Sequence, residues 1–187
     1  MIVRLSELAL PFDRDAYDDW KNGDKSVIPS FLRIPKAVEN QQQYHFGEMF
    51  ALRYFHENEG WLGYEGYALG THLPNSEHRR EGRRKVEDVV PPDKLERFRQ
   101  LRNTEHDKRH GAGEPDLFLY SPDEEHYKLA EVKMPGDRLS PAQYRCIAQI
   151  LASLECEVEI VHLHERGTQR RPKVYCFDLD SFSGWSE

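Results

Sequence analysis

Residues 113–143 read GEPDLFLYSPDEEHYKLAEVKMPGDRLSPAQ, and this stretch decides how the rest of the chain is interpreted. A short apolar run at 117–120 is followed by a polar turn and then by 127–133, where polar and apolar residues alternate as they do in a strand. The alternation sets one face (Tyr127, Leu129, Glu131, Lys133) against the other (Lys128, Ala130, Val132). The stretch therefore predicts a β-hairpin whose second strand carries a glutamate and a lysine on one face.

A helix is expected directly after this hairpin. MPGD at 134–137 breaks the strand, and Pro141 is favoured at the first position of a helix. Ser140 and Gln143 match the S-x-x-Q capping box, which marks a helix N-terminus. The apolar residues that follow repeat on one face of that helix: Ile147, Ile150, Leu151 and Leu154.

Further elements extend in both directions from this core. Downstream, EVEIVHLH (157–164) and KVYCFDL (173–179) are predicted strands. Upstream, apolar spacing predicts a helix from about Val38 to Asn58, closed by Gly60, and the glycines and aromatics of 61–73 suggest a short strand and turn. This order of elements predicts an α/β fold with a mixed β-sheet flanked by helices.

Two segments do not fit that order as clearly. Residues 1–38 are punctuated by prolines and a glycine, and we expect an irregular N-terminal extension there, with the main domain at 39–187. Residues 75–110 are expected to form a charged insertion or loop within that domain. A helix is predicted inside it at about 93–103, because Leu95, Phe98 and Leu101 repeat on one face.

The charge of the chain is unevenly distributed. The chain has 187 residues, which suits one compact domain, and a net charge of -7, which does not by itself indicate a nucleic-acid partner. Residues 75–110 nevertheless carry eleven Lys and Arg against eight Asp and Glu, leaving +3 there and -10 elsewhere. The densest basic run is Arg79, Arg80, Arg83, Arg84 and Lys85. These side chains are candidates for contacts with backbone phosphates, the alternative being an ordinary solvated surface.

Cysteine content and hydropathy restrict the environment of the chain. Three cysteines with no CxxC spacing argue against a disulfide framework and a structural zinc site, and fit a reducing compartment. The first residues lack the apolar centre of a signal peptide, and no apolar run approaches the roughly 20 residues of a membrane span. We therefore expect a soluble cytoplasmic protein with no membrane partner, although a secreted effector could deliver such a domain into another cell.

The hairpin also carries the candidate chemistry. Asp116 leads the first strand and Glu131 lies on the second, so the hairpin brings two carboxylates together across the sheet. Magnesium prefers oxygen ligands in near-octahedral geometry, and the backbone carbonyl of Val132 is a natural third ligand. The ammonium of Lys133, on the same face as Glu131, could orient the attacking water and offset charge on a phosphate.

The pattern resembles that of a known group of enzymes. PD, a hairpin and then E-x-K resembles the PD-(D/E)XK nuclease superfamily, and GEPDLFL with EVKMPGDRLSPAQ is similar to its VRR-NUC branch. The resemblance covers about 107–165. It implies a restriction-endonuclease-like core, so that 39–187 would be a VRR-NUC-type nuclease domain. It also implies a Mg²⁺- or Mn²⁺-dependent nuclease that cleaves DNA, often at branched or flapped structures, and a homodimer among small members.

The resemblance further implies two site residues outside the hairpin. A glutamate on the first core helix commonly joins the metal site in that family, and Glu48 is the candidate, with Glu39 a weaker one. Gln143 matches the family's helix glutamine near the active site. Each has an ordinary alternative, because Glu48 suits a solvent-facing helix position and the capping box alone explains Gln143.

Other interpretations remain open at this point. His106 with His110, and His162 with His164, have spacings that would let each pair share a metal, but ordinary surface or packing roles suit them better. The nuclease could serve repair or phage recombination, or be the toxic domain of an antibacterial effector that an immunity protein neutralises. A third possibility is a catalytically inactive DNA-binding module, which would bind DNA without needing metal or Lys133.

Overall fold

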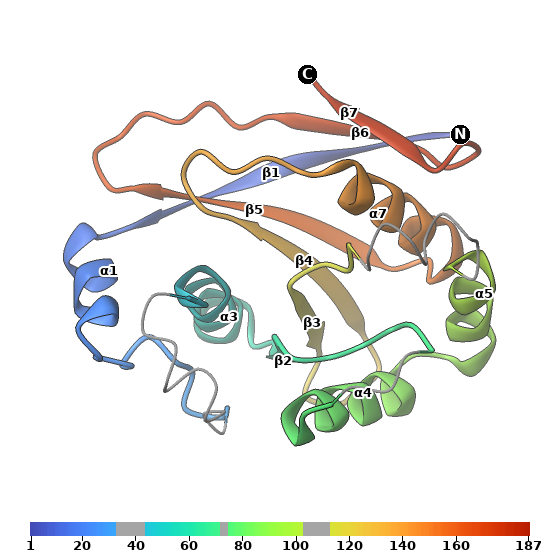
Figure 1. The fold of residues 1–187 in the computed structure, drawn as a ribbon, viewed down its shortest axis with the longest axis horizontal. Coiled ribbons are helices and arrows are strands. Elements are labelled where there is room, and N and C mark those ends of the chain that lie inside the picture. Colours follow the sequence, from blue (N-terminus) through green and yellow to red (C-terminus); the bar gives the residue numbers. More distant parts are fainter. Residues whose placement is uncertain (33–43, 72–74, 103–112) are drawn as a thin grey trace.

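The computed structural model describes residues 1–32, 44–71, 75–102 and 113–187, which form one seven-stranded mixed sheet with helices on both faces (Figure 1). The strand order is β2-β3-β4-β5-β1-β6-β7. The strands are β1 (Ile2–Phe12), β2 (Leu62–Tyr64), β3 (Leu117–Tyr120), β4 (Tyr127–Lys133), β5 (Glu157–Glu165), β6 (Val174–Asp178) and β7 (Ser183–Ser186). The described helices are α1 (Arg14–Lys21), α3 (Phe46–Glu59), α4 (Glu77–Val89), α5 (Pro92–Arg102) and α7 (Pro141–Ser153). The predicted α/β class with a mixed sheet is confirmed.

The predicted hairpin is formed by β3 and β4. They pair antiparallel from Leu117 opposite Ala130 to Tyr120 opposite Tyr127. β4 then pairs parallel with β5, which places Lys133 opposite His162. The helix between them, α7, has the predicted capping box, in which Ser140 and Gln143 satisfy each other's backbone N–H groups. The sequence between residues 113 and 165 therefore folds as its local pattern predicted.

The N-terminal segment is the main correction. Residues 1–38 were expected to be irregular, but 2–12 form β1, which lies inside the sheet, parallel to β5 and antiparallel to β6. Residues 14–21 form α1, and 33–38 lie outside the described residues. The expectation is wrong for the described part because β1 is paired with strands about 150 residues later, so little in its own sequence marks it.

The charged segment is also more ordered than predicted. The helix expected near 93–103 is α5, and its prediction is confirmed. The remainder was expected to be a loop, yet 77–89 form α4, whose first turn is capped by Ser76 accepting from the N–H of Arg79 at 3.3 Å. This helix buries only Gly82 and Val86, so its apolar stripe is too narrow to be recognised in the sequence. Residues 103–110 lie outside the described part.

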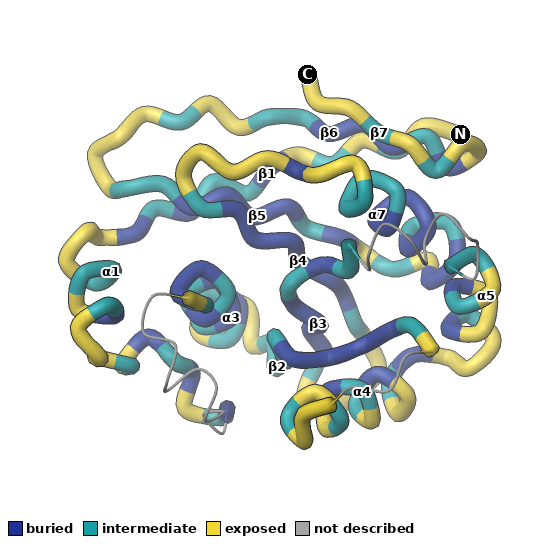
Figure 2. The backbone as a smooth tube through the Cα atoms, in the orientation of Figure 1, coloured by how far each residue is buried: buried dark blue, intermediate teal, exposed yellow. Residues whose placement is uncertain are grey.

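The sheet separates two hydrophobic cores. Figure 2 shows that the central strands between the helices are largely buried. One core joins the sheet to α4, α5 and α7, and the other joins it to α1 and α3. The predicted alternation along β4 is seen directly, because Leu129 belongs to the first core and Ala130 to the second. As predicted, α3 ends at Gly60, whose φ of 77° suits a glycine. It begins at Phe46, and residues 38–43 lie outside the described part.

The cysteines and the helices bear on the environment expected for the chain. All three cysteines are thiols rather than members of disulfides. Within the part of the chain that the structure describes, no helix combines the length and the apolar character needed to cross a membrane.

Candidate active site

The three hairpin residues singled out in the sequence meet at the end of β4. Asp116 lies directly before β3, while Glu131 and Lys133 are among the last three residues of β4. Asp116 Oδ2 accepts a hydrogen bond of 2.8 Å from the N–H of Val132, which stands between Glu131 and Lys133. This bond ties the first carboxylate to the strand that carries the second carboxylate and the lysine.

The segment after β2 fixes the chain that leads into β3. Glu114 accepts hydrogen bonds from the backbone N–H groups of Leu69 and Gly70, both at 3.2 Å. The hydroxyl of Tyr67 donates to the carbonyl of Pro115 at 2.5 Å. Asp116 therefore follows two residues that are each held by side-chain hydrogen bonds, and its position is determined by tertiary contacts as well as by the hairpin.

Glu131, Lys133 and Gln143 form a compact polar cluster on the α7 face of the sheet. Glu131 is completely buried, and its Oε1 lies 2.6 Å from Lys133 Nζ and accepts from Gln143 Nε2 at 2.5 Å. Gln143 Oε1 in turn accepts from Lys133 Nζ at 3.2 Å and from the N–H of Ser140 at 2.9 Å. One amide therefore caps α7 and also contacts Glu131 and Lys133, and the role of Gln143 in a reaction stays a prediction.

The carboxylates carry more negative charge than their surroundings balance. Burial, followed by the charge of Asp116, raises the pKa of Glu131 to about 8. Burial also raises the pKa of Asp116 to about 6, and the charge of Glu48 adds to the effect. Glu131 Oε2 is buried and accepts no hydrogen bond from the N–H and O–H donors of the described residues. A side-chain hydrogen bond links Glu131 to Asp116, and it requires one of the two acids to be protonated. A buried acceptor left in this state costs free energy, which a cation at this position would recover.

Glu48 faces the same site from the opposite core. It lies in the first turn of α3, and its neighbour Gly47 allows that turn to approach β4, since a Cβ there would stand 3.1 Å from Met134 Sδ. Burial alone raises the pKa of Glu48, but the hydrogen bond from His45 and the charge of Lys133 bring it below its usual value. The charge of Glu48 contributes to the raised pKa of Asp116, and a shared role of the two carboxylates stays a prediction.

Glu65 is a further carboxylate that the sequence did not indicate. It follows β2 and is buried at its side chain, with Oε1 2.7 Å from His78 Nε2 and Oε2 without a partner in the described chain. The pKa of His45 is raised by Glu48 first and also by the charges of Glu65 and Asp116, which places Glu65 at the edge of the same acidic region. An ordinary turn sequence surrounds it, and no local signal distinguishes it.

The carboxylates of this region offer the oxygen donors that a divalent cation prefers. In the described ranges, no group of three or more His, Cys, Asp or Glu side chains already stands at metal-binding distances. Magnesium, however, needs only one or two carboxylates when waters and backbone oxygens complete its shell. Asp116 and Oε2 of Glu131 meet that requirement, so the donor set fits a hard cation.

The basic residues predicted to contact phosphate lie on α4, and most are paired with acids. Arg80 and Arg84 contact Glu77 at 2.8 and 3.4 Å, and Arg83 contacts Glu87 at 3.0 Å. The remaining two are Lys85, 2.8 Å from Glu124, and Arg79, which donates to the carbonyl of Tyr67 at 3.5 Å. None of these contacts involves Asp116 or Glu131. Their role in DNA contact stays a prediction.

The histidine pairs have ordinary surroundings where they are described. His162 is buried, and its ring Nδ1 lies 2.9 Å from the carbonyl of Leu163. His164 lies 3.4 Å from the hydroxyl of Thr168. His106 and His110 fall outside the described residues.

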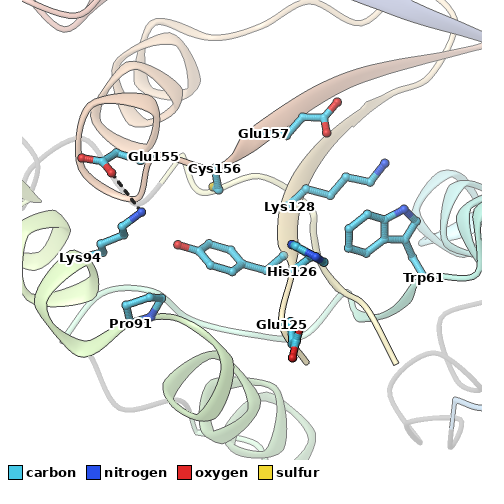
Figure 3. A pocket seen from close by; sticks show the side chains of 10 residues that line it. Trp61, Pro91, Lys94, Glu125, His126, Lys128, Glu155, Cys156 and Glu157 are labelled. Carbon is cyan, nitrogen blue, oxygen red and sulfur yellow. Dashed lines mark ion pairs between the residues drawn. The ribbon is translucent and has the colours of Figure 1, made fainter. Parts of the chain in front are cut away.

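A pocket of about 520 Å³ lies away from this cluster, at the start of β4 (Figure 3). Trp61 and Lys128 line one side of it, and the ion pair between Lys94 and Glu155 lines the other. Asp116, Glu131 and Lys133 are not among the residues that line it. The candidate active site is therefore defined by its buried polar cluster and not by this pocket.

The chain is similar to known proteins over part of their length. A crystal structure described as "paFAN1 bound to 2nt 5'flap DNA with gap" aligns with 88% of this chain and 38% of its own, at 15% identity and a TM-score of 0.44. Fanconi-associated nuclease 1 of Homo sapiens is 44% identical over 52 residues, which are 28% of this chain and 5% of the human protein. The chain thus spans only a small part of these relatives. The profile of the VRR-NUC domain matches residues 63–165, which include the hairpin and α7. This chain belongs to the VRR-NUC domain family of nucleases.

Proposed function

We propose that this protein is a metal-dependent DNA nuclease that hydrolyses phosphodiester bonds. The observation that carries the proposal is the buried carboxylate of Glu131, which lies beside Asp116 and Lys133 and has one oxygen that accepts no hydrogen bond from the described N–H and O–H donors. A purely structural glutamate at this depth would be expected to have both oxygens satisfied. Membership of a nuclease domain family supports the same conclusion.

Asp116 and Glu131 are the proposed metal ligands, together with the backbone carbonyl of Val132 and with Glu48 from α3. Bound Mg²⁺ or Mn²⁺ would lower the pKa of a coordinated water and polarise the phosphoryl oxygen. Glu65, at the edge of the same acidic region, can contribute further negative charge to a cation held there. Removing any of these carboxylates should therefore weaken metal binding.

Lys133 and Gln143 are the proposed partners of the reacting groups. Lys133 Nζ is held between Glu131 Oε1 and Gln143 Oε1, so its ammonium is fixed with little conformational freedom left to lose. In that position it can orient the attacking water and offset the charge that develops on the phosphate. Gln143 acts by holding both Lys133 and Glu131 in place.

The substrate class follows from the family and is DNA. The human relative is named Fanconi-associated nuclease 1, and the aligned crystal structure is described as bound to a 5′ flap DNA. Branched or flapped DNA is therefore the proposed preference of this chain. We propose that the nuclease domain includes β1, since that strand lies within the sheet. A homodimer, and an inhibitor protein for an effector domain, stay predictions.

The test compares wild-type protein with Glu131→Gln, which keeps the shape of the side chain and removes its charge. Each is incubated with supercoiled plasmid, a labelled 5′ flap and a four-way junction in Mg²⁺, Mn²⁺ or EDTA. We expect wild-type cleavage that requires metal and at least a hundredfold loss in the variant. If both proteins bind every DNA and cleave none, the chain is a binding module and the proposal is wrong.

A further inference from the structure

The connection between β5 and β6 is the feature that the proposed function leaves unexplained. Residues 166–173 read RGTQRRPK, four cations with no acidic residue among them. By contrast, α4 carries five cations together with Glu77, Glu81, Glu87 and Asp88. In a chain of net charge -7, a segment with only positive charges is unusual enough to need a reason.

This connection leaves the sheet at the active-site edge. β4 and β5 run parallel with Lys133 opposite His162, so the carboxyl ends of both strands lie at that edge. The connection begins directly after β5, which ends at Glu165. Burial, followed by the charge of Arg170, lowers the pKa of His162, while a hydrogen bond with the backbone of Asp137 raises it. Residues of the loops after β5 and after β4 therefore both lie near this ring.

Two of the four cations fasten the connection to the sheet. Arg166 Nε lies 2.5 Å from Asp13 Oδ1, and Arg170 Nη2 donates to the buried Glu7 Oε1 at 2.5 Å. Glu7 Oε2 also accepts from the N–H of Lys173 at 3.0 Å. The connection is therefore attached at the middle of β1, through Glu7, and just after its last residue, through Asp13. It presents its remaining side chains from a fixed backbone, which lowers the entropy lost on binding.

The other two cations have no such use. Arg171 is exposed and Lys173 is half-buried, and neither side chain has an ion-pair or hydrogen-bond partner within the described ranges. Arg138, in the loop after β4, is exposed and is unpaired by the same criterion. On α4, Arg80, Arg84 and their neighbours are instead balanced by glutamates a few ångströms away.

We propose that Arg171 and Lys173, with Arg138 from the loop after β4, form the surface that contacts the DNA backbone phosphates next to the cleaved bond. The proposal rests on the proposed nuclease function and assigns the contact to this edge rather than to α4. Phosphate contacts are made by unpaired Lys and Arg, carry no sequence information and position the strand on the protein. The surface adjoins the edge where Glu131 and Lys133 lie, and its positive charge offsets the acidic site for an incoming polyanion.

The test uses two double variants that remove the same charge from different surfaces. Arg171→Gln with Lys173→Gln removes the proposed contacts, and Arg80→Gln with Arg84→Gln is the matched control on α4. The affinity of the full chain for a fluorescent flap DNA is measured by anisotropy in EDTA, from 50 to 300 mM salt, roughly the range over which phosphate contacts are screened. Arg138→Gln is measured alongside.

We expect the first double variant to raise the Kd about tenfold at 0.1 M salt and to reduce the salt slope by about two, with less than a twofold change in the control. Melting temperatures should stay equal to wild type in the first variant, because neither side chain has a partner to lose. Equal losses in the two variants, or a larger loss in the control, would overturn the proposal. If wild type cleaves DNA and the first variant binds DNA normally, the proposed phosphate-contact surface is wrong and the proposed nuclease function stands. If wild type neither binds nor cleaves any DNA, the proposed nuclease function is wrong as well.

Discussion

Strand β4 carries a buried lysine near each end, and both lysines contact glutamates. At the start of the strand, Lys128 Nζ donates to Glu59 at 2.8 Å and to Glu159, and it lies over the rings of Phe55 and Trp61. At the other end, Lys133 lies 2.6 Å from Glu131. Both lysines are buried and both pair with acids, yet we propose a structural role for the first and a catalytic role for the second.

The difference lies in what is left unbalanced. Around Lys128, both glutamates are partly exposed and each carries a contact from the ammonium. Burial lowers the pKa of Lys128, but the two glutamates raise it by a larger amount, so the net shift is upward. Around Lys133, Asp116 and Glu131 share one ammonium, their pKa values are raised, and one oxygen of Glu131 accepts no hydrogen bond from the described N–H and O–H donors. An excess of buried acid, rather than a buried lysine, is what marks the functional end of the strand.

The largest expected effect comes from Lys133→Ala. Loss of its ammonium should lower the single-turnover cleavage rate about a thousandfold, because it removes a charge that acts on the transition state. The rate is measured on a labelled flap DNA with saturating Mg²⁺. A variant that keeps more than a tenth of the wild-type rate would place Lys133 in the same structural class as Lys128.

Lys128→Ala should lower the stability of the protein and leave its cleavage rate nearly unchanged. Breaking its ion pairs should cost about 2–3 kcal/mol of unfolding free energy, less than for fully buried pairs because Glu59 and Glu159 are partly open to solvent. Urea unfolding measures this change. The cleavage rate per folded molecule should stay within about twofold of wild type, since stability losses away from a site leave its chemistry intact. A large loss of rate in the folded variant contradicts the comparison.

The pH dependence of stability should also divide the two ends. Glu131 and Asp116 have pKa values of about 8 and about 6 in the folded protein, above ordinary values of 4.5 and 3.8. The folded state therefore binds more protons, and stability in EDTA should fall as pH rises from about 4.5 to 8. Mg²⁺ binds the ionised carboxylates, so it should raise the melting temperature by about 5 °C at pH 8 and less at pH 5.5.

The control for this prediction is Glu131→Gln, which removes the group of highest pKa in the cluster. Its melting temperature should depend less on pH and should respond weakly to Mg²⁺. An unchanged response to Mg²⁺ in this variant would show that the cation binds elsewhere.

A comparison of two variants separates the two proposed roles of Gln143. Gln143→Ala should lower the cleavage rate about 10- to 100-fold, as is typical when a residue that orients a ligand is lost. Ser140→Ala removes only the cap of α7, so it should cost about 1 kcal/mol of stability with little change in rate. Equal rates in the two variants would reduce Gln143 to a capping residue.

The hairpin, α7 and the positions of Glu131 and Lys133 on β4 could be predicted from the amino-acid sequence. The signals there are local: two strands separated by six residues, a capping box across four residues, and alternation that places Glu131 and Lys133 on one face. Short separations mean that neighbouring residues form the contacts, so their pattern is visible in the chain itself. The family resemblance placed Glu48 and Gln143 beside this hairpin.

The other features depend on contacts between residues that lie far apart in the chain. β1 pairs with residues 160–165 and 174–178, and its position in the sheet is fixed by partners that its own sequence cannot specify. Glu65 becomes part of the acidic region only because β2 packs beside β3. The same holds for the α4 cations and for residues 166–173, since charge in a sequence does not show which carboxylates are within reach. Pairings across long separations depend on the packed sheet, and that is where local patterns no longer determine structure.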